Sequence, residues 1–111
     1  MQMQVYYQGM DVSSALDDFM MEKLEKIKRF LAVSNPVQVY LRQDSRDIFS
    51  VSLNVHAFYK DFSFHSKGAN VYEVFASALE KAQRVLGEEK RQLKDKINRK
   101  YQPLKNAEVA S

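Results

Sequence analysis

The residues of this chain that most plainly carry chemistry are the lysines and arginines near its C-terminal end. Between Lys90 and Lys105 the sequence holds seven basic residues and a single acid, Asp95. The whole chain of 111 residues is nearly balanced, with 17 basic residues against 14 acidic ones. Cations gathered in this way repel one another unless an anionic partner compensates them. The pattern indicates a surface that binds phosphates, through neutralisation of a nucleic-acid backbone and release of its counterions.

A second basic group lies in the segment EKLEKIKRF, residues 22–30, which is predicted to be helical. Lys28 and Arg29 fall on the outer face of this helix, whereas Lys23 falls inside its apolar arc and Lys26 flanks it. The stem of Lys23 is expected to lie along the core with its amine at an edge, so that Lys23 and Lys26 line one border of the helix. The predicted RNA-binding residues of both groups are Lys23, Lys26, Lys28, Arg29, Lys81, Arg84, Lys90, Arg91, Lys94, Lys96, Arg99 and Lys100. A solvated helix end, whose lysines complement the helix dipole, is the alternative for the C-terminal group.

Catalytic and metal-binding patterns are weak by comparison. His56 and His65 lie on neighbouring predicted strands, but a hairpin that turns near Tyr59 brings His56 beside Phe62, and no third ligand is evident. The 3 glycines are scattered, so they form no phosphate-binding loop. The absence of cysteine excludes thiolate catalysis, disulfides and cysteine zinc sites. We therefore expect no enzymatic activity, no metal and no cofactor.

Changes in hydrophobic period divide the chain into the order β-α-β-β-β-α. Alternating apolar and polar residues predict strands at residues 3–8, 36–43, 48–56 and 62–66. Helices are predicted from the Ser13–Ser14 pair to about Leu31, and from an Asn70 N-cap to Pro103. One apolar sheet face covered by both helices predicts an α+β two-layer sandwich, similar in layout to double-stranded-RNA-binding domains.

The last helix is predicted to be longer than the sheet is wide. Its apolar stripe is Tyr72, Phe75, Ala76, Leu79, Ala82, Leu86, Leu93, Ile97 and Tyr101. Beyond Gly87 it should extend past the body, with cations on most sides. The open sheet face carries mainly Ser, Asn, Gln and His besides Tyr40, which favours recognition of duplex or folded RNA over stacking on single strands. No signal peptide or apolar span is evident, so a cytoplasmic protein is expected, with a binding domain at residues 1–102 and a flexible tail at 103–111.

Three blocks of the sequence resemble the ribosome hibernation promoting factors and ribosome-associated translation inhibitors of bacteria. They are VSSALDDFMMEKLEKIKRF, NPVQVYL and KGANVYEVFASALEKAQRVLGEEKRQLKDK, in which RQLKDK is the most specific part. The resemblance covers residues 3 to about 101 and is to the short form, without the dimerising domain of long members. Asn70-Val71 replaces the usual Asp-Met of the family, and Gly9-Met10 replaces a basic or polar pair.

The resemblance implies a translation inhibitor that occupies the messenger and A- and P-site transfer RNA channel of the small ribosomal subunit during stationary phase or stress. Its partners would be 16S ribosomal RNA and neighbouring ribosomal proteins, with no membrane, and the chain would be a monomer off the ribosome. Lys23 and Lys26 match basic first-helix positions of the family; the matching second-helix positions are Arg84, Lys90, Arg91, Lys94 and Lys96.

Two other functions compete with this one. A general double-stranded-RNA-binding domain would carry its basic cluster at the start of the last helix, but that start is acidic and apolar until Lys81. A protein–protein module would need a partner with an acidic surface, which no feature of the sequence specifies.

Overall fold

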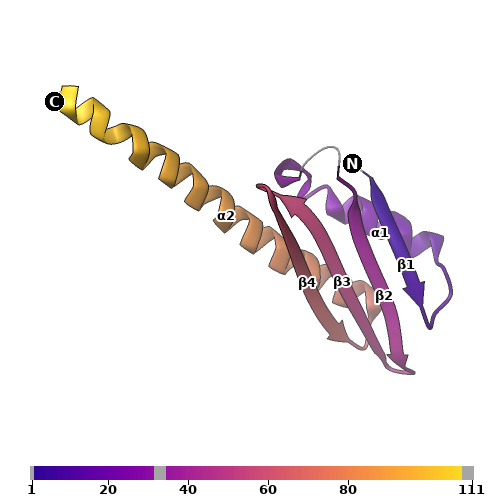
Figure 1. Ribbon diagram of the computed structural model, residues 1–111. Helices are drawn as coiled ribbons and strands as arrows, with labels where there is room; N and C mark the ends of the chain where they lie inside the picture. The colour runs from indigo at the N-terminus through magenta and orange to yellow at the C-terminus, as the bar shows by residue number, and fades with distance from the viewer. Residues whose placement is uncertain (1, 32–34, 109–111) are drawn as a thin grey trace.

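The computed structural model describes residues 2–31 and 35–108, and from residue 98 onward only the path of the backbone. The elements, in chain order, are strand β1 (Met3–Gln8), helix α1 (Ser14–Leu24), the 3-10 turn η1 (Lys28–Phe30), strands β2 (Val37–Ser45), β3 (Ile48–Ala57) and β4 (Lys60–Gly68), and helix α2 (Val71–Glu108). The 4-stranded sheet has the order β1-β2-β3-β4, with β1 parallel to β2 and the other pairs antiparallel. Both helices lie on one face of it (Figure 1), which confirms the predicted α+β two-layer sandwich.

The alternation of the strands places one set of side chains in the core, as predicted. Val39 on β2 and Leu53 on β3 are fully buried, and they are cross-strand partners. Against them pack Leu16, Met20 and Leu24 from α1, and Phe75, Leu79, Ala82 and Leu86 from α2. Burial of these apolar surfaces is the main force that holds the helices on the sheet.

Helix α1 begins where the sequence predicts but ends earlier. Ser13 is the N-cap, and its Oγ accepts a hydrogen bond from the Leu16 backbone N–H at 3.1 Å. The predicted end near Leu31 is wrong, because the α-helix stops at Leu24 and continues as tighter turns up to η1. Since a 3-10 helix has three residues per turn, this tightening keeps Leu24, Ile27 and Phe30 on one buried side.

Tyr7 fixes the start of α1 to strand β1. Its hydroxyl donates to Asp17 Oδ1 at 2.6 Å and lies 3.0 Å from the Ser13 carbonyl oxygen. Burial, with the Asp17 hydrogen bond, raises the pKa of Tyr7 to about 12. The phenol is therefore neutral at physiological pH and can keep donating to the carboxylate.

Helix α2 departs from its prediction in two places. Asn70 is the predicted N-cap, and its Oδ1 accepts from the backbone N–H groups of Tyr72 and Glu73. The predicted end at Pro103 is wrong, since the helix runs to Glu108. A proline inside a helix removes one hydrogen bond and its ring crowds the carbonyl four residues earlier, so the helix continues there at a cost of about 3 kcal/mol. Ala76, placed on the apolar stripe, is exposed, and Val74 and Ala78 are buried instead.

The connection between β3 and β4 is a two-residue turn at Phe58 and Tyr59. Both have positive φ, 53° and 64°, as a type I′ hairpin turn requires. Phe58 packs on Phe30 with ring centroids 6.3 Å apart, which offsets part of its backbone strain. The register pairs His56 with Asp61, one residue away from the predicted partner Phe62.

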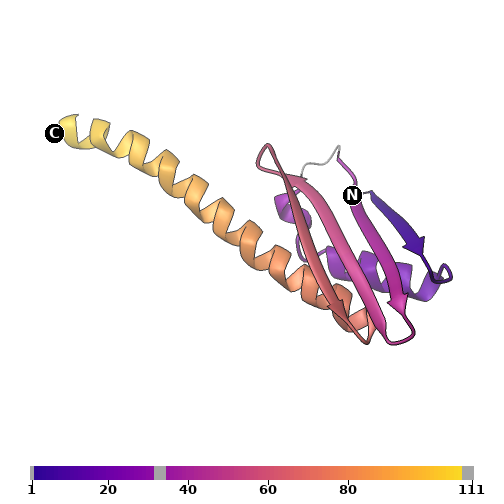
Figure 2. The ribbon, with the colours of Figure 1, turned by 60° about the horizontal axis from the view of Figure 1, so that its bottom comes forward.

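Helix α2 extends beyond the two layers, as predicted. The molecule measures 66 × 25 × 19 Å, and its long dimension follows the projecting end of α2 (Figures 1 and 2). Lys60 at the start of β4 pairs with Glu89 at 2.6 Å, near the last point where α2 touches the body. None of the helices in residues 2–31 and 35–108 is long and apolar enough to cross a membrane.

Candidate nucleic-acid interface

The projecting part of α2 presents exposed lysines. Lys94 and Lys96 are exposed, and within the described residues neither forms an ion pair or a side-chain hydrogen bond. Unpaired ammonium groups on a helix that meets solvent on most sides can approach phosphates from several directions. Among the predicted binding residues, these two have the ammonium groups that are most clearly available to phosphates.

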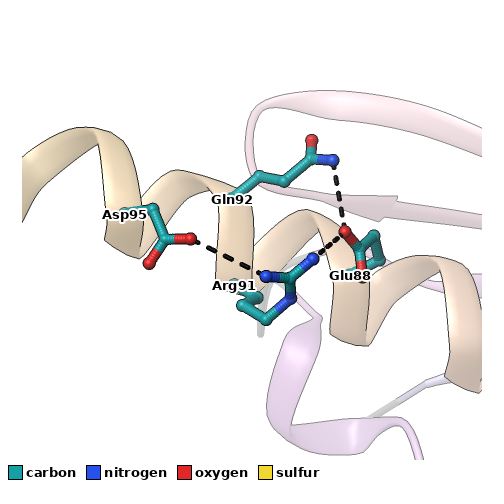
Figure 3. Close-up of polar contacts among 4 residues, drawn as sticks. All are labelled: Glu88, Arg91, Gln92 and Asp95. Atoms are coloured by element: carbon teal, nitrogen blue, oxygen red, sulfur yellow. Dashed lines mark hydrogen bonds and ion pairs between the residues drawn. The ribbon is translucent and has the colours of Figure 1, made fainter.

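Arg91 lies on the same segment, but its charge is already engaged. Figure 3 shows its guanidinium between Glu88 and Asp95: it forms a close hydrogen-bonded ion pair with Glu88 and lies 3.8 Å from the Asp95 carboxylate. Gln92 Nε2 also donates to Glu88, at 3.3 Å. The Arg91 hydrogen bond holds the pKa of Glu88 below its usual range, and Glu88 in turn raises the pKa of Arg91. Arg91 therefore has to exchange carboxylates for phosphates in order to bind RNA.

The two predicted basic groups meet at the ring of Phe30. Arg29 Cζ lies 4.7 Å from the ring centroid, and Lys90 Nζ, from α2, lies 5.9 Å from it. Both distances are within the range of cation–π attraction. Phe30 is buried, so it gives the two cations a fixed platform where α2 leaves the body.

Lys23 also lies over an aromatic ring, in the layer that the two helices form. Its Nζ lies 5.5 Å from the ring centroid of Phe19, one helical turn earlier, and Phe19 packs edge-on against Tyr72 of α2 at 4.9 Å. The lysine is half-buried, which confirms that its stem lies along the core. Lys26 is exposed in the turn after α1, and Lys28 pairs with Glu25 at 3.7 Å.

The remaining predicted residues do not join this group. Lys81 turns to the outer edge of the sheet, where its Nζ donates to the His65 carbonyl oxygen of β4 at 2.7 Å. Arg84 lines a shallow hollow of about 390 Å³ with the acids Glu88 and Glu89. Arg99 and Lys100 were predicted as binding residues, and their side chains lie outside the described residues.

The histidines take part in local polar pairs. His56 Nδ1 lies 2.8 Å from Asp61 Oδ1, and His65 Nδ1 lies 2.9 Å from Ser52 Oγ. In the part of the chain that the structure describes, no three His, Cys, Asp or Glu side chains gather as metal ligands. Sequence reasoning missed the aromatic platforms beneath Lys23, Arg29 and Lys90; the spacing of four residues between Phe19 and Lys23 was a usable signal for one of them.

Fold and charge together define a small α+β protein with a cationic helical extension, suited to an anionic partner. The chain belongs to the family described as Sigma 54 modulation protein / S30EA ribosomal protein, whose model matches residues 3–94. That range contains all the predicted binding residues from Lys23 to Lys94 and ends before Lys96, Arg99 and Lys100.

Solved structures share the fold at low sequence identity. A ribosomal subunit interface protein from Coxiella burnetii superimposes with a TM-score of 0.69 at 19% identity, covering 82% of this chain and 99% of that chain. The N-terminal domain of Protein Y from Thermus thermophilus gives a TM-score of 0.68 at 14% identity, covering 78% of this chain and 96% of that chain. No curated protein sequence matches the chain.

Proposed function

We propose that this chain is a ribosome-associated inhibitor of translation that binds the small ribosomal subunit in its messenger and transfer RNA channel during stationary phase or stress. Family membership supports a ribosomal role, and the Coxiella relative is described as a ribosomal subunit interface protein. The observation that carries the proposal is the projecting end of α2, on which Lys94 and Lys96 stand exposed and unpaired in the described residues.

The physical basis of inhibition would be occupancy. At 1.5 Å per residue, the stretch of α2 from Lys90 to Glu108 is about 28 Å long, enough to fill a groove between RNA segments. Lysines around it would neutralise phosphates and release counterions, so binding would weaken steeply as salt rises. The cations on Phe30 and Phe19 would hold the body beside the same RNA. Such a role needs no covalent chemistry. In this proposal residues 1–102 would form the binding domain, and residues 103–111 would form its tail.

The test is sedimentation of the purified protein with purified small subunits over a range of salt concentrations. The double variant Lys94→Glu/Lys96→Glu should bind roughly tenfold more weakly or worse, because two phosphate contacts become repulsions. Its melting temperature should stay unchanged, since both side chains are exposed and unpaired within the described residues. Arg46→Glu, in the turn between β2 and β3, is a single charge reversal away from α2 and should bind as the parent does.

Two outcomes would count against the proposal. Equal affinity for small subunits and for random duplex RNA would favour a general double-stranded-RNA-binding domain. Parent-like binding by the double variant would remove the projecting helix from the interface.

The family description also includes modulation of sigma-54, which favours a protein–protein module as the second candidate. Gradient sedimentation of stationary-phase extract separates the two. Comigration with ribosomes that the Lys94→Glu/Lys96→Glu variant loses supports the first function, and a peak of free protein supports the second.

A further inference from the structure

The sheet face opposite the helices contains a trough that follows β3. It is an open depression of about 590 Å³, within the roughly 300–1,000 Å³ range of small-ligand sites. Its floor is made by Ser50 and Ser52, whose short side chains stand between longer neighbours on β2 and β4. Figure 1 shows this face toward the viewer, with both helices behind the sheet.

Aromatic rings form the walls of the trough at Ser52. Tyr40 on β2 and His65 on β4 are the two cross-strand partners of Ser52. Strands two apart in a sheet are separated by about 9.5 Å. His65 Nδ1 lies 2.9 Å from Ser52 Oγ, so the imidazole has to turn away from Ser52 before one flat ring fits between the two side chains. Tyr6 stacks behind Tyr40 with ring centroids 4.7 Å apart and 12° between the planes, so it supports the Tyr40 wall from the other side.

Charged side chains form the walls two residues earlier on β3, at Ser50. Arg42 and Lys67 are the cross-strand partners of Ser50, about 7 Å from the aromatic row. An anion already lies between them: the Asp44 carboxylate accepts a short hydrogen bond from Ser50, pairs closely with Arg42 and lies 3.7 Å from Lys67. These contacts, led by the Ser50 hydrogen bond, hold the pKa of Asp44 below its usual range.

We propose that this trough binds one nucleotide of a single-stranded RNA segment. Its base would lie over Ser52 between Tyr40 and His65, and its phosphate would replace the Asp44 carboxylate between Arg42 and Lys67. Ring and cation rows about 7 Å apart match the base-to-phosphate reach of a nucleotide, and stacking on aromatic side chains tolerates any base. The sequence placed Tyr40 and His65 on this face without predicting that it stacks bases; the structure adds Tyr6, which stacks on Tyr40, and places His65 opposite Tyr40 across Ser52.

The trough is distinct from the interface proposed above, because the projecting helix and the Phe30 platform belong to the opposite layer. Asp44 gives the proposal a directional test. If the carboxylate stands where a phosphate binds, its removal strengthens RNA binding; if the cluster is only structural, its removal does not. Asn can still accept the hydrogen bond from Ser50, so Asp44→Asn is the mild form of this change.

The experiment titrates the full chain, labelled with ¹⁵N, with a single-stranded adenylate hexamer at low salt, and follows amide shifts and affinity. Shifts should centre on β2, β3 and β4 near Ser50 and Ser52. Tyr40→Leu and Arg42→Gln should each weaken hexamer binding roughly tenfold, and Asp44→Asn should strengthen it severalfold. Arg46→Gln removes a nearby cation outside the trough and should bind as the parent does.

Lys94→Gln/Lys96→Gln separates this proposal from the ribosome proposal, since it should spare hexamer binding while weakening binding to small subunits. Shifts centred on α2, parent-like binding by Arg42→Gln, or weaker binding by Asp44→Asn would each overturn the trough as a nucleotide site. Arg42 is exposed, so Arg42→Gln still tests the site even if Tyr40→Leu disturbs the sheet.

Discussion

The two halves of α2 follow one helical pattern but have opposite surroundings. From Val74 to Leu86 the apolar positions Phe75, Ala82 and Leu86 are completely buried against the sheet. Further along the same stripe, Leu93 is 41% exposed and Ile97 is 50% exposed. The body half is held by the core, whereas the projecting half touches the body near its start, through Glu89 and Lys90.

The difference follows from length. The 38 residues of α2 span about 57 Å, while the longest strand, with 10 residues, spans about 34 Å. An apolar stripe therefore identifies the apolar face of a helix, but it does not show whether other residues bury that face. Where this burial ends, the exposed residues Lys94 and Lys96 begin, which form no ion pair within the described residues.

The largest expected effect tests whether burial explains the difference between the two halves of α2. Leu86→Ala should lower the free energy of unfolding by about 3 kcal/mol, because it leaves a cavity under a fully buried side chain. Leu93→Ala, the same substitution two turns later, should cost less than about 1 kcal/mol. Denaturant unfolding of both variants measures the contrast. Similar losses would mean that the projecting half packs against the body or a second copy in solution.

A smaller effect is expected at Gly87, the boundary between the halves. A Cβ atom added there would meet nothing within 4 Å, so Gly87→Ala should stabilise the helix by about 1 kcal/mol through propensity alone. Amide exchange at residues 88–96 should slow in this variant. The matched control is Ala76→Gly, at an exposed position of the body half, which should lose a similar amount. Unchanged exchange after Gly87→Ala would indicate that the projecting segment does not fray at this glycine.

Much of the two-layer body could be predicted from sequence because the local pattern of each helix and strand agrees with the way it packs on its neighbours. Alternation in β2 and β3 placed Val39 and Leu53 in the core, and side-chain capping at Ser13 and Asn70 placed both helix starts. The end of α1 could not be predicted in this way. Tight turns after Leu24 depend on the pocket that receives Ile27 and Phe30, which exists only once the sheet and α2 are assembled.

The positive charge of the candidate site could be predicted from the sequence, but the ion pairs and hydrogen bonds of its residues could not. Counting residues found the basic groups, but it could not tell that Arg91 is held by Glu88 and Asp95 or that Lys81 turns to the edge of β4. The trough shows the same limit: Tyr6 and Tyr40 are 34 positions apart, and only the parallel pairing of β1 and β2 brings them together. Such pairs depend on which strands pair and in which register; the alternation within a strand excludes a slip by one residue but does not identify the partner residue.

The smallest expected effect concerns the Glu88–Arg91 pair on the projecting half. Since the native pKa of Glu88 is lowered by Arg91, the pair contributes stability above the ordinary carboxyl pKa of about 4.3, and the contribution is lost as pH falls through the lowered native value. Carboxyl NMR should show a Glu88 midpoint below the ordinary value, returning to it in Arg91→Gln. Glu88→Gln should free Arg91 for phosphate, so the salt dependence of small-subunit binding should steepen by about 0.9 in the log–log slope. An unchanged slope would mean that Arg91 gains no phosphate contact when Glu88 is removed, leaving Lys94 and Lys96 as the phosphate contacts of this segment.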